Sequence, residues 1–238
     1  MAKVRIDKAI SQLGIASRSQ VRSMISKGRI AVNGILPKSI NDKCDPDTDI
    51  ITVDGEAIEY KQYHYLMMNK PAGVVSATED AKDKTVVSLL EGRYSKMDLF
   101  PVGRLDKDSE GFLILTNDGK FAHKVISPSK NVYKRYYIQV EGRIGEEDKM
   151  AVEKGILLKD GTKCRPGKLE IIKSGEKSEA YMMISEGKYH QVKRMMAALG
   201  KPVLYLKRVS IGFVQLDSSL TPGQYREMTK EEIDALEK

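Results

Sequence analysis

The sequence has few of the residues that build metal sites and disulfide frameworks. It contains two cysteines, Cys44 and Cys164, and three isolated histidines, His64, His123 and His190. The cysteines lie 120 positions apart and form no Cys-x-x-Cys pair. Metal sites and disulfide scaffolds usually show such residues in number or at short spacing. We therefore expect neither a metal site nor a disulfide framework.

Long apolar runs are also missing. A membrane-spanning helix needs about 20 apolar residues, and the longest apolar stretches of this chain are far shorter. The amino-terminal segment MAKVRIDKAI carries charges where a signal peptide needs its apolar part. Hydrophobic residues at 41% and charged residues at 31% are typical of an ordinary soluble protein. We expect a cytoplasmic protein of one or two domains.

Negative charge is scarce in one part of the chain. Residues 1–40 hold eight Lys or Arg and a single acid, Asp7, whereas the other 198 residues carry 32 charges of each sign. This asymmetry indicates a polyanionic partner, usually phosphate. Anionic lipid is the alternative, but no Trp or Phe precedes residue 100 to anchor a membrane-bound helix. The charge distribution therefore favours nucleic acid.

The basic amino-terminal segment has a recognisable order of elements. Ile6, Ile10 and Leu13 recur at helical spacing, and Ser17-Arg18-Ser19-Gln20 is a capping box that begins a second, basic helix. A short strand then runs into Asn33-Gly34, a strong hairpin-turn signal.

This segment, RIDKAISQLGIASRSQVRSMISKGRIAVNG, resembles the alpha-L RNA-binding module first known from ribosomal protein S-four. We expect the S4-like module to occupy residues 1–59. The resemblance implies RNA-phosphate contacts through Arg5, Arg18, Arg22, Lys27 and Arg29, since guanidinium groups bind phosphate in a bidentate manner. The alternative is that these residues form the solvated faces of amphipathic helices.

Residues 60–63 read as a linker, and residues 64–238 as a second domain. Apolar patterns predict strands at 65–68, 112–115, 136–140, 169–172, 180–184 and 203–206. Helices are expected at 85–90, 146–154 and 189–199, with a last one after the capping pair Thr229 and Glu232. Because strands and helices do not alternate regularly, we expect an α+β fold with a mixed, mainly antiparallel sheet flanked by helices.

The stretch GRLDKDSEGFLILTNDG, residues 103–119, places one acid where chemistry can use it. The apolar run at 112–115, followed by the turn residues Asn117-Asp118-Gly119, predicts a buried strand. Asp106 then lies in the loop that enters this strand, and loops held by a rigid sheet often carry catalytic residues. A solvated turn formed by Asp106, Lys107 and Asp108 is the alternative.

Four segments of the second domain follow one another along the chain: NKPAGVVS at 69–76, FPVGRLDKDSEGFLILTNDG at 100–119, KRYYIQV at 134–140 and EGKYHQVKRMMAALG at 186–200. This series resembles the motifs of the A-type pseudouridine synthases of the small ribosomal subunit. With the amino-terminal module, the resemblance spans essentially the whole chain. It implies an enzyme that flips a uridine out of RNA and isomerises it, with an essential aspartate and no cofactor.

The resemblance also assigns site residues. Asp106 matches the catalytic aspartate, Tyr136 the active-site tyrosine that packs against the base, and Lys193 the basic partner of the acid, where many relatives have Arg. Whether Asp106 acts as a nucleophile or as a base stays open. Leu206 is the candidate aliphatic residue of the uracil pocket.

Further cations are given supporting roles. Arg104 corresponds to the arginine that helps hold the nucleotide out of its stack, with an ion pair to a neighbouring acid as the alternative. Arg194 is expected to reach RNA phosphate. His190 is expected to be a structural helix residue, with a titrating role as the alternative. Lys70 reads as scaffold in a turn that supports the sheet.

Within the resemblance, the segment YHQVKR at 189–194 favours 16S ribosomal RNA, or a partly assembled small ribosomal particle, as the partner. We expect the enzyme to be a monomer. Relatives that modify 23S ribosomal RNA usually resemble Asn-Arg-Gln-Val-Arg-Arg there and remain the alternative. A non-catalytic RNA-binding assembly factor is a further alternative, which the intact Asp106, Tyr136 and Lys193 disfavour.

Overall fold

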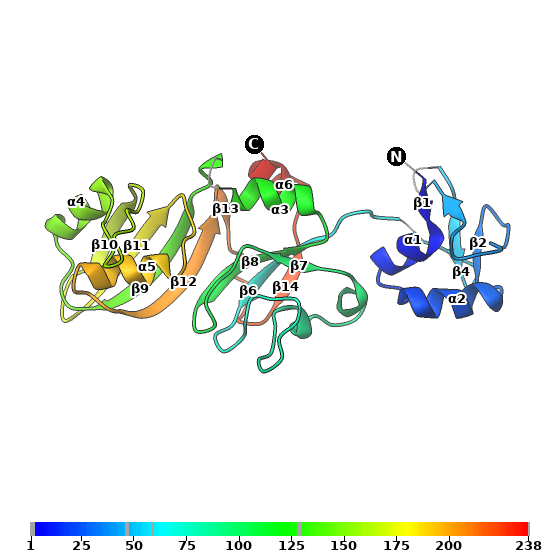
Figure 1. The fold of residues 1–238 in the computed structure, drawn as a ribbon, viewed down its shortest axis with the longest axis horizontal. Helices are drawn as coiled ribbons and strands as arrows, with labels where there is room; N and C mark the ends of the chain where they lie inside the picture. The colour runs from blue at the N-terminus through cyan, green and yellow to red at the C-terminus, as the bar shows by residue number, and fades with distance from the viewer. Residues whose placement is uncertain (1–2, 46–47, 59, 128–129, 238) are drawn as a thin grey trace. The chain divides into compact units, whose positions relative to one another are not determined.

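A computed structural model of the protein describes residues 3–45, 48–58, 60–127 and 130–237. The chain divides into two compact units (Figure 1). The first comprises residues 1–64 and 87–100, and the second comprises residues 65–86 and 101–238. Residue 59, where the expected first domain ends, lies outside the described residues. Tyr60, in the expected linker, packs against the first core and donates a hydrogen bond to Gln12.

The first unit packs two helices against short strands. Its elements are β1 (Val4–Arg5), α1 (Ile6–Gln12), α2 (Arg18–Ser26), β2 (Ile30–Val32), β3 (Lys43–Cys44), β4 (Ile51–Val53), β5 (Glu56–Ile58) and the short 3-10 helices η1 (Val87–Leu89) and η2 (Tyr94–Lys96). Strand β1 pairs with β3, and β2, β4 and β5 form an antiparallel sheet. Ile6, Ile10, Val21 and Ile30 are among the residues of its core, which accounts for the helical spacing seen in the sequence.

Local sequence signals set the boundaries of these elements. The predicted capping box is present, since the Ser17 amide donates to Gln20 Oε1 and the Ser17 hydroxyl accepts from the Gln20 amide. Asn33 and Gly34 both adopt left-handed backbone conformations, with φ of 52° and 78°. They form the tight turn expected of this dipeptide, although β2 then pairs along its length with β4.

The second unit contains a mixed sheet. In the described residues its strands follow the order β10 (Lys168–Lys173), β11 (Lys177–Ile184), β9 (Lys134–Glu141), β12 (Val203–Ile211), β8 (Glu110–Thr116), β6 (Tyr65–Lys70) and β14 (Tyr225–Glu227). Strand β7 (Phe100–Val102) pairs with β8, and β13 (Val214–Gln215) pairs with β12. Strands β12 and β8 are parallel, and the other neighbours on this path are antiparallel. The expected mixed, mainly antiparallel sheet is confirmed.

The parallel pair brings two backbones very close together. Gly111 of β8 lies opposite Arg208 of β12 and has a φ of 104°. A Cβ atom at residue 111 would lie 2.2 Å from the carbonyl oxygen of Arg208, so only glycine fits there without a shift.

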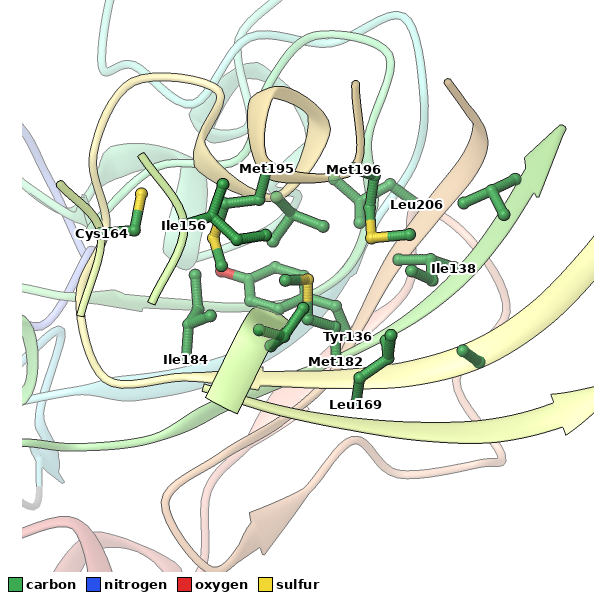
Figure 2. Close-up of a cluster of buried hydrophobic side chains, with 14 of the residues drawn as sticks. Tyr136, Ile138, Ile156, Cys164, Leu169, Met182, Ile184, Met195, Met196 and Leu206 are labelled. Atoms are coloured by element: carbon green, nitrogen blue, oxygen red, sulfur yellow. The ribbon is translucent and has the colours of Figure 1, made fainter. Parts of the chain in front are cut away.

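Four helices accompany the sheet in the described residues, as Figure 1 shows: α3 (Gly119–Ile126), α4 (Glu146–Lys154), α5 (Gln191–Ala198) and α6 (Lys230–Glu237). Helix α4 contacts β10, α5 contacts β12, and α3 contacts α6. Alternate residues of β9, Tyr136, Ile138 and Val140, are buried in an apolar core that includes residues of α5 (Figure 2). Within the described ranges, no helix has the length and apolar character needed to cross a membrane.

Three expected elements need correction. Asn117-Asp118-Gly119 does not form a simple turn, because Asp118 Oδ1 accepts hydrogen bonds from the amides of Lys120 and Phe121 and begins helix α3. The helix expected at 85–90 is only the 3-10 turn η1. Helix α5 begins at Gln191, so Tyr189 and His190 precede it.

Candidate active site

One pocket in the second unit collects side chains from well-separated parts of the sequence. Arg104, Leu105, Asp106 and Ser109 come from the loop before β8, Tyr136 from β9, Ile184 from β11 and Leu206 from β12. Residues 187–188 and 190–193, at and before the start of α5, complete the lining. The fold thus brings together five residues singled out in the sequence: Arg104, Asp106, Tyr136, Lys193 and Leu206.

Asp106 lies in the loop that enters β8, as expected, and its side chain is about one quarter exposed to the pocket. Lys193 Nζ lies 3.2 Å from Asp106 Oδ2 and 2.5 Å from Asp108 Oδ1, so one amine bridges both carboxylates. The hydrogen bond from Lys193 lowers the pKa of Asp108 below its usual value. Burial acts to lower the pKa of Lys193, but the bonds to Asp108 and Asp106 outweigh it and raise that pKa.

His190 also approaches the acid, which the sequence did not indicate. Its Nε2 atom lies 3.4 Å from Asp106 Oδ1. The expectation that this residue lies inside a helix is wrong. It precedes α5 with a left-handed φ of 48°, which turns its ring toward the pocket.

The loop that carries His190 is fixed by a buried polar network. Gln191 Nε2 donates to Glu186 Oε1 at 2.5 Å, and Gln191 Oε1 accepts from the Lys188 amide at 2.9 Å. Glu186 Oε1 also accepts from the Arg165 amide at 2.8 Å. Buried and fully bonded groups of this kind hold a loop in one conformation.

The buried side chain of Lys70 holds the loop that carries Asp106. Its side chain is fully buried, and Nζ donates to the carbonyl oxygens of Pro71 and Asp106 at 3.0 Å and of Ser109 at 2.8 Å. Burial lowers the pKa of Lys70 to about 8, and the nearby carboxylates of Asp108 and Asp106 act in the opposite direction. These contacts are in line with the scaffold role expected for Lys70, and they place it under the loop that carries Asp106.

Tyr136 and Leu206 form the apolar part of the pocket. Both are more than nine-tenths buried and belong to the core cluster as well as to the pocket lining. Figure 2 shows the Tyr136 ring among side chains of the sheet and of α5, including Met182 and Met195. Tyr137 points to the opposite face, where its hydroxyl donates to Glu179.

Two further cations differ in their surroundings. Arg104 is exposed at the pocket, and in the described part of the chain it forms no ion pair with Asp106 or Asp108, so the alternative structural pair is not formed. Arg194 does not line the pocket and pairs instead with Asp160 at 2.5 Å.

The expected RNA-binding residues of the first unit fall into two groups. Arg5 makes a bidentate pair with the buried Asp7, and Arg29 makes one with Asp54. Arg18, Arg22 and Lys27 are exposed and have no ion pair among the residues that the structure describes.

The described residues contain no group of three or more His, Cys, Asp or Glu side chains that could hold a metal ion.

Comparisons with known proteins match two parts of the chain to known families. Residues 64–198 match the family described as RNA pseudouridylate synthase, and residues 4–50 match the S4 domain. The chain belongs to the RNA pseudouridine synthases.

The similarity to members of this family extends over the full chain. An uncharacterized RNA pseudouridine synthase of Bacillus subtilis is 46% identical, with 98% of each chain covered. The ribosomal small subunit pseudouridine synthase A of Vibrio cholerae is 35% identical, with 98% of this chain and 99% of the relative covered. The ribosomal large subunit pseudouridine synthase B of Bacillus subtilis is also 35% identical, with 98% and 95% covered.

A solved structure described as a pseudouridylate synthase has a TM-score of 0.68 and 35% identity to this pseudouridine synthase. The alignment covers 98% of this chain and 99% of that one. The α+β fold with a small S4 unit is therefore shared with this family member.

Proposed function

We propose that this pseudouridine synthase isomerises a uridine of 16S ribosomal RNA and that Asp106 is its catalytic carboxylate. One observation carries the proposal: Asp106, Lys193, Tyr136, Arg104 and Leu206 line a single pocket. A carboxylate held by an amine, beside an aromatic ring and an aliphatic side chain, suits an extruded uracil, because the base is apolar on its faces and reacts at its edge.

Each residue has a role in this proposal. Asp106 supplies the carboxylate that the isomerisation needs, as nucleophile or as base, and Lys193 orients it. Tyr136 and Leu206 contact the flipped base. Arg104 has no competing ion pair with the acids of its loop and occupies the space that the base leaves in the RNA stack, which offsets part of the few kcal/mol that extrusion costs.

The RNA is captured by the first unit. The exposed Arg18, Arg22 and Lys27 have no ion pairs to give up before they bind phosphate, within the part of the chain described. Arg5 and Arg29 contribute while remaining paired with acids, and Arg194 contributes less because Asp160 holds it.

The choice of 16S ribosomal RNA rests on the segment Tyr189–Arg194, whose sequence YHQVKR resembles the enzymes that modify this RNA. Overall identity does not discriminate, because the relatives named for the small and for the large ribosomal particle are both 35% identical to this chain. The alternative substrate is 23S ribosomal RNA.

Release of tritium from uracil C5 tests both parts of the proposal. Transcripts of 16S and 23S ribosomal RNA, and partly assembled small ribosomal particles, are labelled at C5 and incubated with the enzyme. We expect release from 16S RNA or its particles, and a loss of at least about a thousandfold in Asp106→Asn with unchanged RNA binding. Release only from 23S RNA contradicts the substrate, and undiminished release by Asp106→Asn contradicts the catalytic role. No release from any RNA supports a non-catalytic binding factor.

A further inference from the structure

Tyr189 presents an aromatic ring to solvent directly beside the pocket. The residue is 76% exposed and does not line the pocket itself. Its ring stacks on His190, with ring centroids 3.8 Å apart and planes inclined by 18°. His190 does line the pocket and approaches Asp106. The two rings therefore form a short stack that connects the site to the surface.

The stack is held in place by its backbone. His190 adopts a left-handed conformation, which is unfavourable for a residue with a side chain and persists only where the surroundings enforce it. The enforcing contacts are those of Gln191 with Glu186 and with the Lys188 amide. Tyr189 is 76% exposed and, in the described residues, has no ring neighbour other than His190, so the ring face turned away from His190 is open.

The chemistry around the stack indicates what covers that face. Arg104, an exposed cation without an ion pair in the described residues, lines the adjoining pocket and favours an anionic ligand. Extruding a base from RNA leaves each of its two neighbours with one face unstacked, and Arg104 in the vacated space can cover one of these faces. An aromatic side chain can stack on such a face, and every base offers one.

We propose that the open face of Tyr189 stacks on a nucleobase adjacent to the target uridine, so that the Tyr189–His190 stack is a binding surface for substrate RNA. This inference rests on the proposed function. It assigns to Tyr189 a role in RNA binding and none in the bond rearrangement.

The test measures tritium release from a transcript that the wild-type enzyme modifies, with KM and kcat determined separately. We expect Tyr189→Ala to raise KM about tenfold, equivalent to about 1.4 kcal/mol, and to leave kcat within about twofold. Tyr189→Phe keeps the ring and should match the wild type. Phe213→Ala is the control, because Phe213 is 92% exposed and does not line the pocket.

The outcomes separate this inference from the function on which it rests. If the wild type releases no tritium from any RNA, the proposed function fails. If the wild type is active and Tyr189→Ala leaves KM unchanged, lowers kcat alone, or has no larger effect than Phe213→Ala, the stacking role is overturned. A KM that is raised in Tyr189→Ala and equal to the wild-type value in Tyr189→Phe supports the stacking role.

Discussion

Two lysines at the active site, Lys193 and Lys70, and two arginines of the first unit, Arg18 and Arg22, are held in opposite ways. Lys193 bridges two carboxylates and Lys70 is surrounded by carbonyl oxygens, so each amine has one position. Arg18 and Arg22 are exposed and without ion pairs in the described chain. A fixed cation can orient a reacting group within a fraction of an ångström. A free cation attracts the phosphates of an RNA whatever its base sequence. The contrast suggests that catalysis and capture are separable in this enzyme.

Removing a fixed cation should have the largest effect. Lys193→Met leaves Asp106 without the amine that orients it, so we expect kcat for tritium release to fall at least about a hundredfold with little change in RNA affinity. Lys193→Arg should retain much of the activity, because it keeps the charge. Asp108→Asn is the control and should cost much less. If kcat falls by a similar factor in Lys193→Met and in Asp108→Asn, activity depends on the contact of Lys193 with both carboxylates and not on its pair with Asp106 alone.

The second prediction concerns pH and the buried amine of Lys70. Its pKa is lowered to about 8, so it loses its proton as the pH rises through that value and donates less well to the carbonyl oxygens of the Asp106 loop. Between about pH 7 and pH 9 we expect kcat to fall about tenfold. Measurement of kcat against pH checks this.

Loss of folding should not be the cause of that decline. The unfolded chain keeps the Lys70 proton up to about pH 10.5, so between pH 8 and 10.5 the unfolded state binds more protons and the contribution of Lys70 to the free energy of unfolding rises with pH. Denaturant unfolding at each pH measures this. Lys134 is a matched control, since burial and Arg208 also lower its pKa to about 8. If Lys134→Met abolishes the alkaline decline, Lys70 is not responsible.

Removing free cations should have the smallest effect. Replacing Arg18 and Arg22 with Ala should weaken RNA binding about fivefold and reduce the slope of log affinity against log salt by about 1.4 to 1.8, with kcat unchanged. Titrations at several salt concentrations measure the slope. Replacing Lys173 and Lys177, which are exposed in the second unit, removes the same charge elsewhere. Equal slopes for the two double variants would mean that only net charge matters.

Motif order was enough to predict which residues share the pocket, because Asp106, Tyr136 and Lys193 each lie in a segment that resembles the family. The roles of His190 and Lys70 were not predictable in this way. The His190 contact depends on a left-handed backbone that Gln191 and Glu186 enforce, and the Lys70 contacts depend on a loop 36 to 39 residues further along the chain. Both sets of contacts are tertiary, although a scaffold role for Lys70 was expected from its place in a turn at the end of an apolar strand.

The error at Asp118 has a different origin. Asn-Asp-Gly is compatible with a turn and with the start of a helix, so the local sequence is ambiguous. The outcome is decided by the burial of Phe121 and Val125 on the helix that follows. The parallel pairing of β8 with β12 is likewise invisible in the sequence, because it joins strands almost 100 residues apart.

That parallel pairing brings together the two strands that lead from Asp106 and from Leu206. Asp106 lies shortly before Gly111 on one side, and Leu206 lies shortly before Arg208 on the other. At the point where the strands meet, Gly111 contributes no side chain, and an added Cβ atom there would collide with the main chain of Arg208. The close approach of these two strands therefore depends on the absence of a side chain at residue 111. Any larger residue at position 111 would push apart the strands that follow Asp106 and Leu206, so a glycine that touches no substrate is needed for the two sides of the pocket to meet.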